Sequence, residues 1–151
     1  MHKGGPMRFG IVISVFSLLG LIGSTAAQEE PVVQVYKSPT CGCCSVWVAH
    51  LEKNGFTVNT TDVPNTGTIK QEQGVPRRLG SCHTAVVDGY LVEGHVPAED
   101  IKRLLTDRPA LKGIAVPGMP IGSPGMEGPN PQPYDVLGFD EQGNVTVFSS
   151  H

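Results

Sequence analysis

Three of the four cysteines of the chain, Cys41, Cys43 and Cys44, lie within four residues in the stretch SPTCGCCSVW. Cys41 and Cys44 have CxxC spacing, and at the start of a helix they would share one face and could act as a redox pair. The third thiol, Cys43, invites wrong pairings in a dithiol enzyme. For a soft metal such as Cu(I) it adds a ligand that the metal favours. The spacing leaves three uses open, namely structural disulfides, a redox pair and a metal site.

Structural disulfides are the least favoured of these uses. Cysteines so near one another close short loops, which restrict the unfolded chain little, and Cys82 alone lies far away. Zinc is a weaker match than a soft metal, because structural zinc usually takes two separated ligand pairs. This chain offers one crowded cluster and one Cys82-His83 pair, which favours a soft-metal or multinuclear thiolate site.

Further donors lie downstream of the cluster. Cys82 and His83 occur in LGSCHTAVV, just before an expected strand. In a thioredoxin-like topology this loop lies against the CxxC, so a fourth thiol and an imidazole would face the first three. His95, in VEGHVPAED, is by its position alone a loop or capping histidine.

The remaining sulfur and imidazole groups are weaker candidates. Met119 and Met126 stand in a Gly- and Pro-rich segment, and their thioethers could close a copper site, because thioether is a soft ligand. His50 is expected on the exposed side of the first helix, and His151 at a frayed terminus.

The elements that position these residues follow the order β, α, β, α, β, β, α. A Thr68-x-x-Gln71 capping box marks the second helix, and Asp88-Gly89 marks a hairpin turn. The first βαβ unit should be parallel and the hairpin antiparallel. The prediction is an α/β fold, a thioredoxin-like mixed sheet flanked by helices with a CxxC at the first strand-to-helix junction. The expected segments are 31–37, 44–54, 56–63, 68–74, 84–94 and 97–107.

The chain changes character after Lys112. Residues 113–133 are dense in glycine and proline, so neither a regular helix nor a central strand is expected there. Because the segment also carries Val, Ile and Met, it is predicted to be an ordered surface loop rather than a disordered linker. Residues 134–151 are predicted to form a C-terminal β-hairpin that turns near Gly143-Asn144.

The N-terminus indicates export. Residues 1–27 combine Lys3 and Arg8, an apolar run and small residues at a cleavage site, which predicts a signal peptide. An uncleaved anchor is the alternative, but the run is short for a span of about 20 residues. Cleavage leaves residues 28–151 as a single domain, with no stable membrane insertion expected. Loss of Lys3 and Arg8 moves the formal net charge from −3 to −5, which argues against nucleic acid as a partner.

Three long stretches resemble a known family. YKSPTCGCCSVWVAHLEKNGF, SCHTAVVDGYLVEGHVPAEDIKRLL and KGIAVPGMPIGSPGME, followed by YDVLGFD, are similar to bacterial periplasmic copper-resistance proteins of the CopG type. The resemblance covers about Val32 to His151. It implies a thioredoxin-like fold and a CxCC motif that binds copper in a multinuclear cluster. Carried over residue by residue, the implied metal ligands are Cys41, Cys43, Cys44, Cys82, His83, His95, Met119 and Met126.

The leading hypothesis is therefore a periplasmic protein for copper tolerance. It would hold Cu(I) in a thiolate cluster, and conversion between Cu(I) and Cu(II) would make it a copper oxidoreductase. Its partners would be copper ions and a periplasmic copper transporter or chaperone. The alternative is a periplasmic thiol–disulfide oxidoreductase that uses Cys41 and Cys44. A third hypothesis is a passive copper chaperone that transfers the metal without changing its oxidation state.

Overall fold

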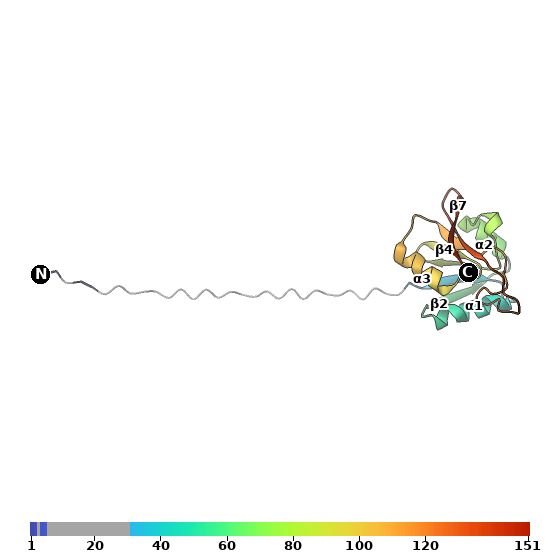
Figure 1. The fold of residues 1–151 in the computed structure, drawn as a ribbon, viewed down its shortest axis with the longest axis horizontal. Coiled ribbons are helices and arrows are strands. Elements are labelled where there is room, and N and C mark those ends of the chain that lie inside the picture. The colour runs from blue at the N-terminus through green and yellow to red at the C-terminus, as the bar shows by residue number, and fades with distance from the viewer. Residues whose placement is uncertain (3, 6–30) are drawn as a thin grey trace.

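A computed structural model of the chain describes residues 1–2, 4–5 and 31–151 (Figure 1). The predicted signal peptide falls almost entirely outside these residues. All seven strands of the described part form one sheet in the order β2-β1-β3-β4-β5-β6-β7. β1 pairs parallel with β2 and β4 with β5, and the other neighbours are antiparallel. The elements are β1 (Val33–Lys37), α1 (Gly42–Lys53), β2 (Val58–Asp62), α2 (Thr66–Gln73), the 3-10 helix η1 (Arg77–Leu79), β3 (Thr84–Val87), β4 (Tyr90–Glu93), α3 (Ala98–Asp107), β5 (Gly113–Ala115), β6 (Asp135–Phe139) and β7 (Val145–Ser150).

The predicted mixed α/β sheet with helices on both faces is confirmed. On one face, α1 and α3 bury Trp47, Leu51, Ile101 and Leu104 against the sheet in the main core. On the other face a smaller core gathers around Leu79 of η1, and α2 lies on this side. Successive strand residues point to opposite faces, so strands such as β4 contribute to both cores, with Val92 in the main core and Leu91 in the smaller one. Membership of the thioredoxin-like folds rests on this element order and stays a prediction.

The start of α2 differs from the expected capping box. Asn65 is the N-cap, in an extended conformation, and its side chain accepts from the Gly67 N–H at 2.9 Å. Thr68 therefore lies inside the helix. Asparagine is among the strongest N-cap residues and ranks above threonine, which explains why the helix begins before the predicted box. Its end is as expected, since Gly74 is in the left-handed conformation.

The expectation that no central strand follows Lys112 is wrong. β5 lies between β4 and β6, and its three residues are buried. A Cβ on Gly113 would collide with the Leu91 carbonyl oxygen. Glycine thus allows the close approach that places β5 in the sheet, where a glycine-rich pattern had argued against a strand. The ordered loop begins after this strand.

The C-terminal hairpin of β6 and β7 is confirmed, and its last residue is ordered. His151 exchanges backbone hydrogen bonds with Tyr134 at 2.9 and 3.1 Å, and its ring stacks on the Tyr134 ring. His151 Nε2 also lies 2.7 Å from Oδ2 of buried Asp100 on α3. The prediction of a frayed terminus is wrong, because these contacts attach the chain end to α3.

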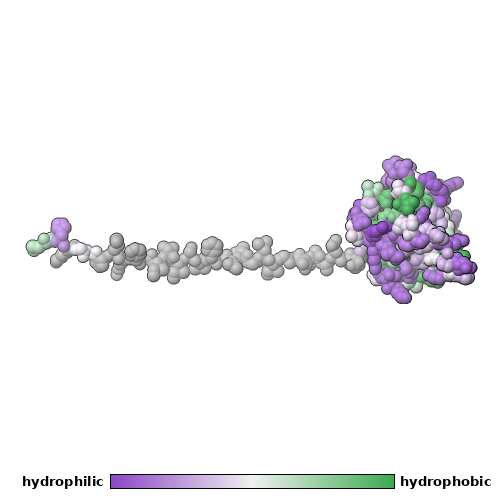
Figure 2. Space-filling view, in the orientation of Figure 1, coloured by the Kyte–Doolittle hydropathy of each residue, from purple (hydrophilic) through white to green (hydrophobic). Residues whose placement is uncertain are grey.

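The visible surface of the folded part is mainly hydrophilic, and its most prominent hydrophobic area lies near the top of the view (Figure 2). Within the described residues, no helix has both the length and the apolar character needed to cross a membrane.

Candidate metal centre

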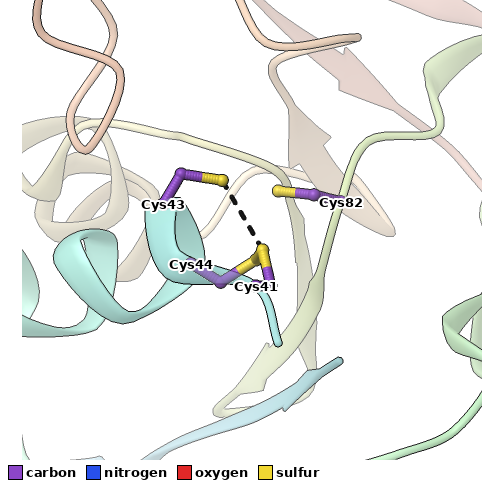
Figure 3. A group of neighbouring side chains, drawn as sticks. All are labelled: Cys41, Cys43, Cys44 and Cys82. Carbon is purple, nitrogen blue, oxygen red and sulfur yellow. Dashed lines mark hydrogen bonds between the residues drawn. A yellow bond between two sulfur atoms is a disulfide. The ribbon is translucent and has the colours of Figure 1, made fainter. Parts of the chain in front are cut away.

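The CxCC motif lies at the N-terminus of α1. Cys41 is the N-cap residue and makes no side-chain cap, so the positive end of the helix dipole lies among the sulfurs. Cys41 and Cys44 form a disulfide. Cys44 is fully buried and Cys41 is partly exposed, as predicted for the two members of the pair. Cys43 remains a free thiol, with its Sγ 3.5 Å from Cys41 Sγ (Figure 3).

Cys82 completes a group of four sulfurs. It precedes β3 and points toward Cys43 from the opposite side of the site (Figure 3). The four Sγ atoms all lie within 4.8 Å of one another. Burial, followed by the nearby Cys43 sulfur, raises the pKa of the Cys82 thiol to about 11. Without a metal this sulfur is therefore a protonated thiol at neutral pH, and a metal that binds it as thiolate must displace a proton.

Cys82 also belongs to a second group of donors, with His83 and His95. One ligand atom from each of the three residues lies within 4.8 Å of the others. Cys82 Sγ is 3.2 Å from His83 Nδ1 and 3.0 Å from His95 Nε2. Because Cys82 is shared, the two groups form one continuous set of four sulfurs and two imidazoles. We call these six residues the Cys/His cluster.

His83 has an unpartnered nitrogen in the protein interior. Its side chain is fully buried, and Nε2 has no hydrogen-bond partner among the described residues. Burial first, then the nearby His95 and Lys70, holds the pKa of His83 well below its ordinary value. The ring packs 4.2 Å from the Trp47 ring, centroid to centroid. Nδ1 is the ring nitrogen that faces Cys82 Sγ, whereas the unpartnered Nε2 is a costly buried polar atom. A neutral, buried imidazole of this kind is of the type that binds metals.

His95 is oriented by the loop that follows β5. Its Nδ1–H donates to the Pro124 carbonyl oxygen at 2.7 Å, so Nε2 carries the lone pair and faces Cys82. Burial lowers the pKa of His95, which keeps the imidazole neutral. A hydrogen bond from the second ring nitrogen to a carbonyl is the usual way in which a metal-binding histidine is oriented. By its position alone, His95 was expected to be a plain loop histidine. The carbonyl that orients it belongs to Pro124, 29 residues further along the chain, so local sequence could not reveal this contact.

The two methionines lie on the loop of residues 116–134. This loop is joined to the segment before Cys82 by the Gly118 N–H, which donates to the Gly80 carbonyl at 3.3 Å. Met119 is about half exposed, at 49%. The ligand role of Met119 and Met126 stays a prediction.

His50 has a role that sequence reasoning missed. Its Nε2 accepts from the Ala98 N–H at 3.2 Å and so caps the first turn of α3. It is half-buried rather than a surface residue, and burial lowers its pKa. Periodicity placed His50 on the outer face of α1 but could not show that α3 begins beside it.

Comparisons with known proteins agree with this site. The family described as a protein of unknown function, DUF411, matches residues 79–126, which include Cys82, His83 and His95. Two solved structures, described as copper resistance protein CopG, form 2 and form 1, each share 45% sequence identity with the chain and have a TM-score of 0.77. Each covers 82% of this chain, and the match spans 99% and 98% of the two relatives.

The chain belongs to the CopG family of copper resistance proteins. Among curated proteins, none matches it. The structural match extends over nearly the whole length of both CopG relatives.

Proposed function

We propose that this CopG-family chain is an exported copper-binding protein that acts in the periplasm and supports copper tolerance. Copper is its cargo, held as Cu(I) by thiolates of Cys41, Cys43, Cys44 and Cys82. His83 and His95 complete the ligand set, and Met119 and Met126 cap it. Residues 1–27 are the signal peptide, and residues 28–151 form the single metal-binding domain. The observation that carries the proposal is the Cys/His cluster, in which neutral imidazoles adjoin four sulfurs.

The donor types support copper over other metals. Four sulfurs within 4.8 Å of one another can share metal ions, as suits a multinuclear Cu(I) cluster. Thiolate stabilises Cu(I), whereas imidazole also suits Cu(II). A ligand set that offers both allows one electron to pass between copper and an external acceptor without release of the metal. This would make the protein a copper oxidoreductase as well as a binding protein.

The disulfide sets a condition on loading. Before all four sulfurs can bind, the Cys41–Cys44 bond must accept two electrons and two protons from a thiol-class reductant. The mostly protonated Cys82 thiol then loses its proton as copper binds. Copper binding should therefore be weaker at lower pH and need reducing conditions.

The test is an anaerobic Cu(I) titration of the reduced protein, read by metal analysis and by counting thiols that resist alkylation. We expect more than one copper per chain, with all four thiols protected. Cys43→Ser should lower the stoichiometry, whereas Ser45→Ala, an exposed change on the same helix, should not. An unchanged stoichiometry in Cys43→Ser would argue against a shared thiolate cluster. Copper that leaves in the oxidation state in which it arrived would favour a passive chaperone that serves a copper transporter.

A second candidate function is supported by the Cys41–Cys44 disulfide itself. A substrate thiolate could attack Cys41 Sγ, release Cys44 as a thiolate and form a mixed disulfide. A second substrate thiol would then resolve it, so that the substrate is oxidised and the protein gains two thiols. Metal-free protein would then catalyse insulin reduction when a dithiol is supplied. This activity should disappear in Cys41→Ser and persist in Cys43→Ser, and its absence from the parent protein would refute the oxidoreductase hypothesis.

A further inference from the structure

A fully buried carboxylate lies beside the Cys82 segment and is not part of the Cys/His cluster. Glu93 is the last residue of β4, with an exposed fraction of 0%. Its Oε1 accepts from the Ser81 N–H at 2.6 Å and from Lys70 Nζ at 2.8 Å. Its Oε2 accepts from the Thr84 hydroxyl at 2.7 Å. Lys70 on α2 also donates to the Thr84 hydroxyl at 3.0 Å, which closes the network.

These contacts hold both ends of the Cys82–His83 segment. Ser81 directly precedes the segment and Thr84 directly follows it, so one carboxylate binds the backbone before and the side chain after it. Gly94, directly after β4, adds to this, because its N–H donates to the His83 carbonyl at 3.1 Å. Gly94 has a φ of +73°, and a Cβ there would lie 2.5 Å from Ser81 Oγ. The segment therefore packs directly onto the end of β4.

A buried ion pair is rarely the most stabilising way to fix a loop in place. Charges that leave water lose their hydration, and apolar residues of similar size often stabilise a fold as well or better. In the Lys70–Glu93 pair the Glu93 side chain is fully buried. The pair lies beside the segment that carries two candidate metal ligands, Cys82 and His83. Carboxylates outside the metal's own contacts commonly orient a ligating side chain by hydrogen bonding to it. Glu93 would act one step further away, through the residues on either side of Cys82 and His83.

We propose that Glu93, held by Lys70, is the positioning residue that sets Cys82 and His83 in place for metal binding. The inference rests on the proposed function and deepens it. Asp100 provides a matched comparison. It is also a buried carboxylate, at 3% exposure, and its partners are Arg103, Ser149 and His151 on α3 and at the chain end.

The first experiment needs no metal. In a Cys43→Ser background with the disulfide closed, Cys82 is the remaining free thiol among the four cysteines. Cys82 is partly exposed, so its alkylation rate is measured over a range of pH, which separates the thiolate fraction from the accessibility that the segment controls. Glu93→Ala should raise this rate by about tenfold or more, because two hydrogen bonds that close the segment are lost. Asp100→Ala should leave the rate within about twofold, provided that both variants are measured well below their unfolding transitions.

Glu93→Gln keeps the side-chain shape and gives a second test if Glu93→Ala does not fold. It removes the charge that pairs with Lys70, and a several-fold faster alkylation is expected. Rates equal to the background in both Glu93 variants would overturn the proposal. So would an equal increase in Asp100→Ala, since general destabilisation would then explain the result.

The second experiment uses the reduced protein with all four cysteines and a Cu(I) chelator as competitor. Glu93→Ala should weaken Cu(I) affinity by about 10- to 100-fold, the usual effect of removing a group that orients metal ligands. Asp100→Ala should bind like the parent. Parent affinity in Glu93→Ala would overturn the positioning role. If the parent binds no Cu(I), the proposed function fails, and the alkylation rates still decide whether Glu93 positions Cys82.

Discussion

Gly125 is where the loop of residues 116–134 closes over the Cys/His cluster, so Gly125→Ala should disturb both stability and copper binding. Gly125 has a φ of +84°. A Cβ at this position would lie 2.8 Å from the Cys43 carbonyl oxygen, 3.0 Å from the Trp47 backbone nitrogen and 3.2 Å from His95 Nδ1. Two of these neighbours are backbone atoms of α1, which cannot move aside as a flexible side chain can.

The expected loss of stability has two parts. A left-handed conformation costs an alanine about 1–2 kcal/mol relative to glycine. Forcing a methyl group into close-packed surroundings costs about 1–3 kcal/mol more. The free energy of unfolding should therefore fall by about 2–5 kcal/mol. Gly89→Ala is a matched control, because Gly89 has a φ of +85° and an added Cβ would meet nothing within 4 Å. Gly89→Ala should therefore lose only the conformational part, about 1–2 kcal/mol of the free energy of unfolding.

Urea denaturation of the metal-free protein, followed by circular dichroism, measures this difference. Cu(I) competition then tests the consequence for the site. His95 donates to the carbonyl of Pro124, the residue before Gly125, so displacing the loop should misorient the imidazole and weaken Cu(I) binding. Gly89→Ala should keep parent affinity. If Gly125→Ala were no less stable than Gly89→Ala and bound copper equally well, the loop would not pack on α1 and His95 as described.

Two further predictions concern α1. The folded-state pKa of His50 is lowered by burial from 6.5, so the stability linked to its neutral form is present above pH 6.5 and is lost as pH falls below that value. The free energy of unfolding falls by at most about 1.4 kcal/mol per pH unit from this group. His50→Gln keeps an acceptor for the Ala98 N–H but does not titrate. Urea denaturation between pH 7 and 5 should therefore show a smaller dependence of stability on pH in this variant. Trp47→Phe should lower the free energy of unfolding by about 2–4 kcal/mol, because it leaves a cavity and removes the 2.9 Å hydrogen bond to the Val96 carbonyl. A loss below about 1 kcal/mol in thermal or urea unfolding would contradict this packing.

Local signals predicted most of the fold. Asp88 and Gly89 both have positive φ, at +46° and +85°, as the hairpin signal required. Pro97, predicted as the first helical residue, is the N-cap of α3, so the helix begins one residue later than predicted. Such patterns are readable because a turn or a cap is decided by a few neighbouring residues. The errors came where distant contacts outweighed local preference, as at β5, which glycine allows to pack against Leu91.

The CxCC motif illustrates what the sequence determined by itself. The spacing of Cys41, Cys43 and Cys44 brings three sulfurs to one helix end, because helical geometry is the same wherever the helix lies. Residue type alone then favours a soft metal or a redox pair. Cys82 and His83 could also be anticipated, once the order of strands and helices was known.

The tertiary structure decided what surrounds these groups. Whether His95 faces the sulfurs depends on the Pro124 carbonyl, which lies far along the chain and directs its ring. The roles of Glu93 and Lys70 depend on α2 packing beside β3 and β4. The sequence does not show whether a given carboxylate will be buried. The orientation of an imidazole depends on which acceptor the folded chain brings within hydrogen-bond reach. The donor types are thus a property of the sequence, whereas their burial, orientation and protonation arise from long-range packing.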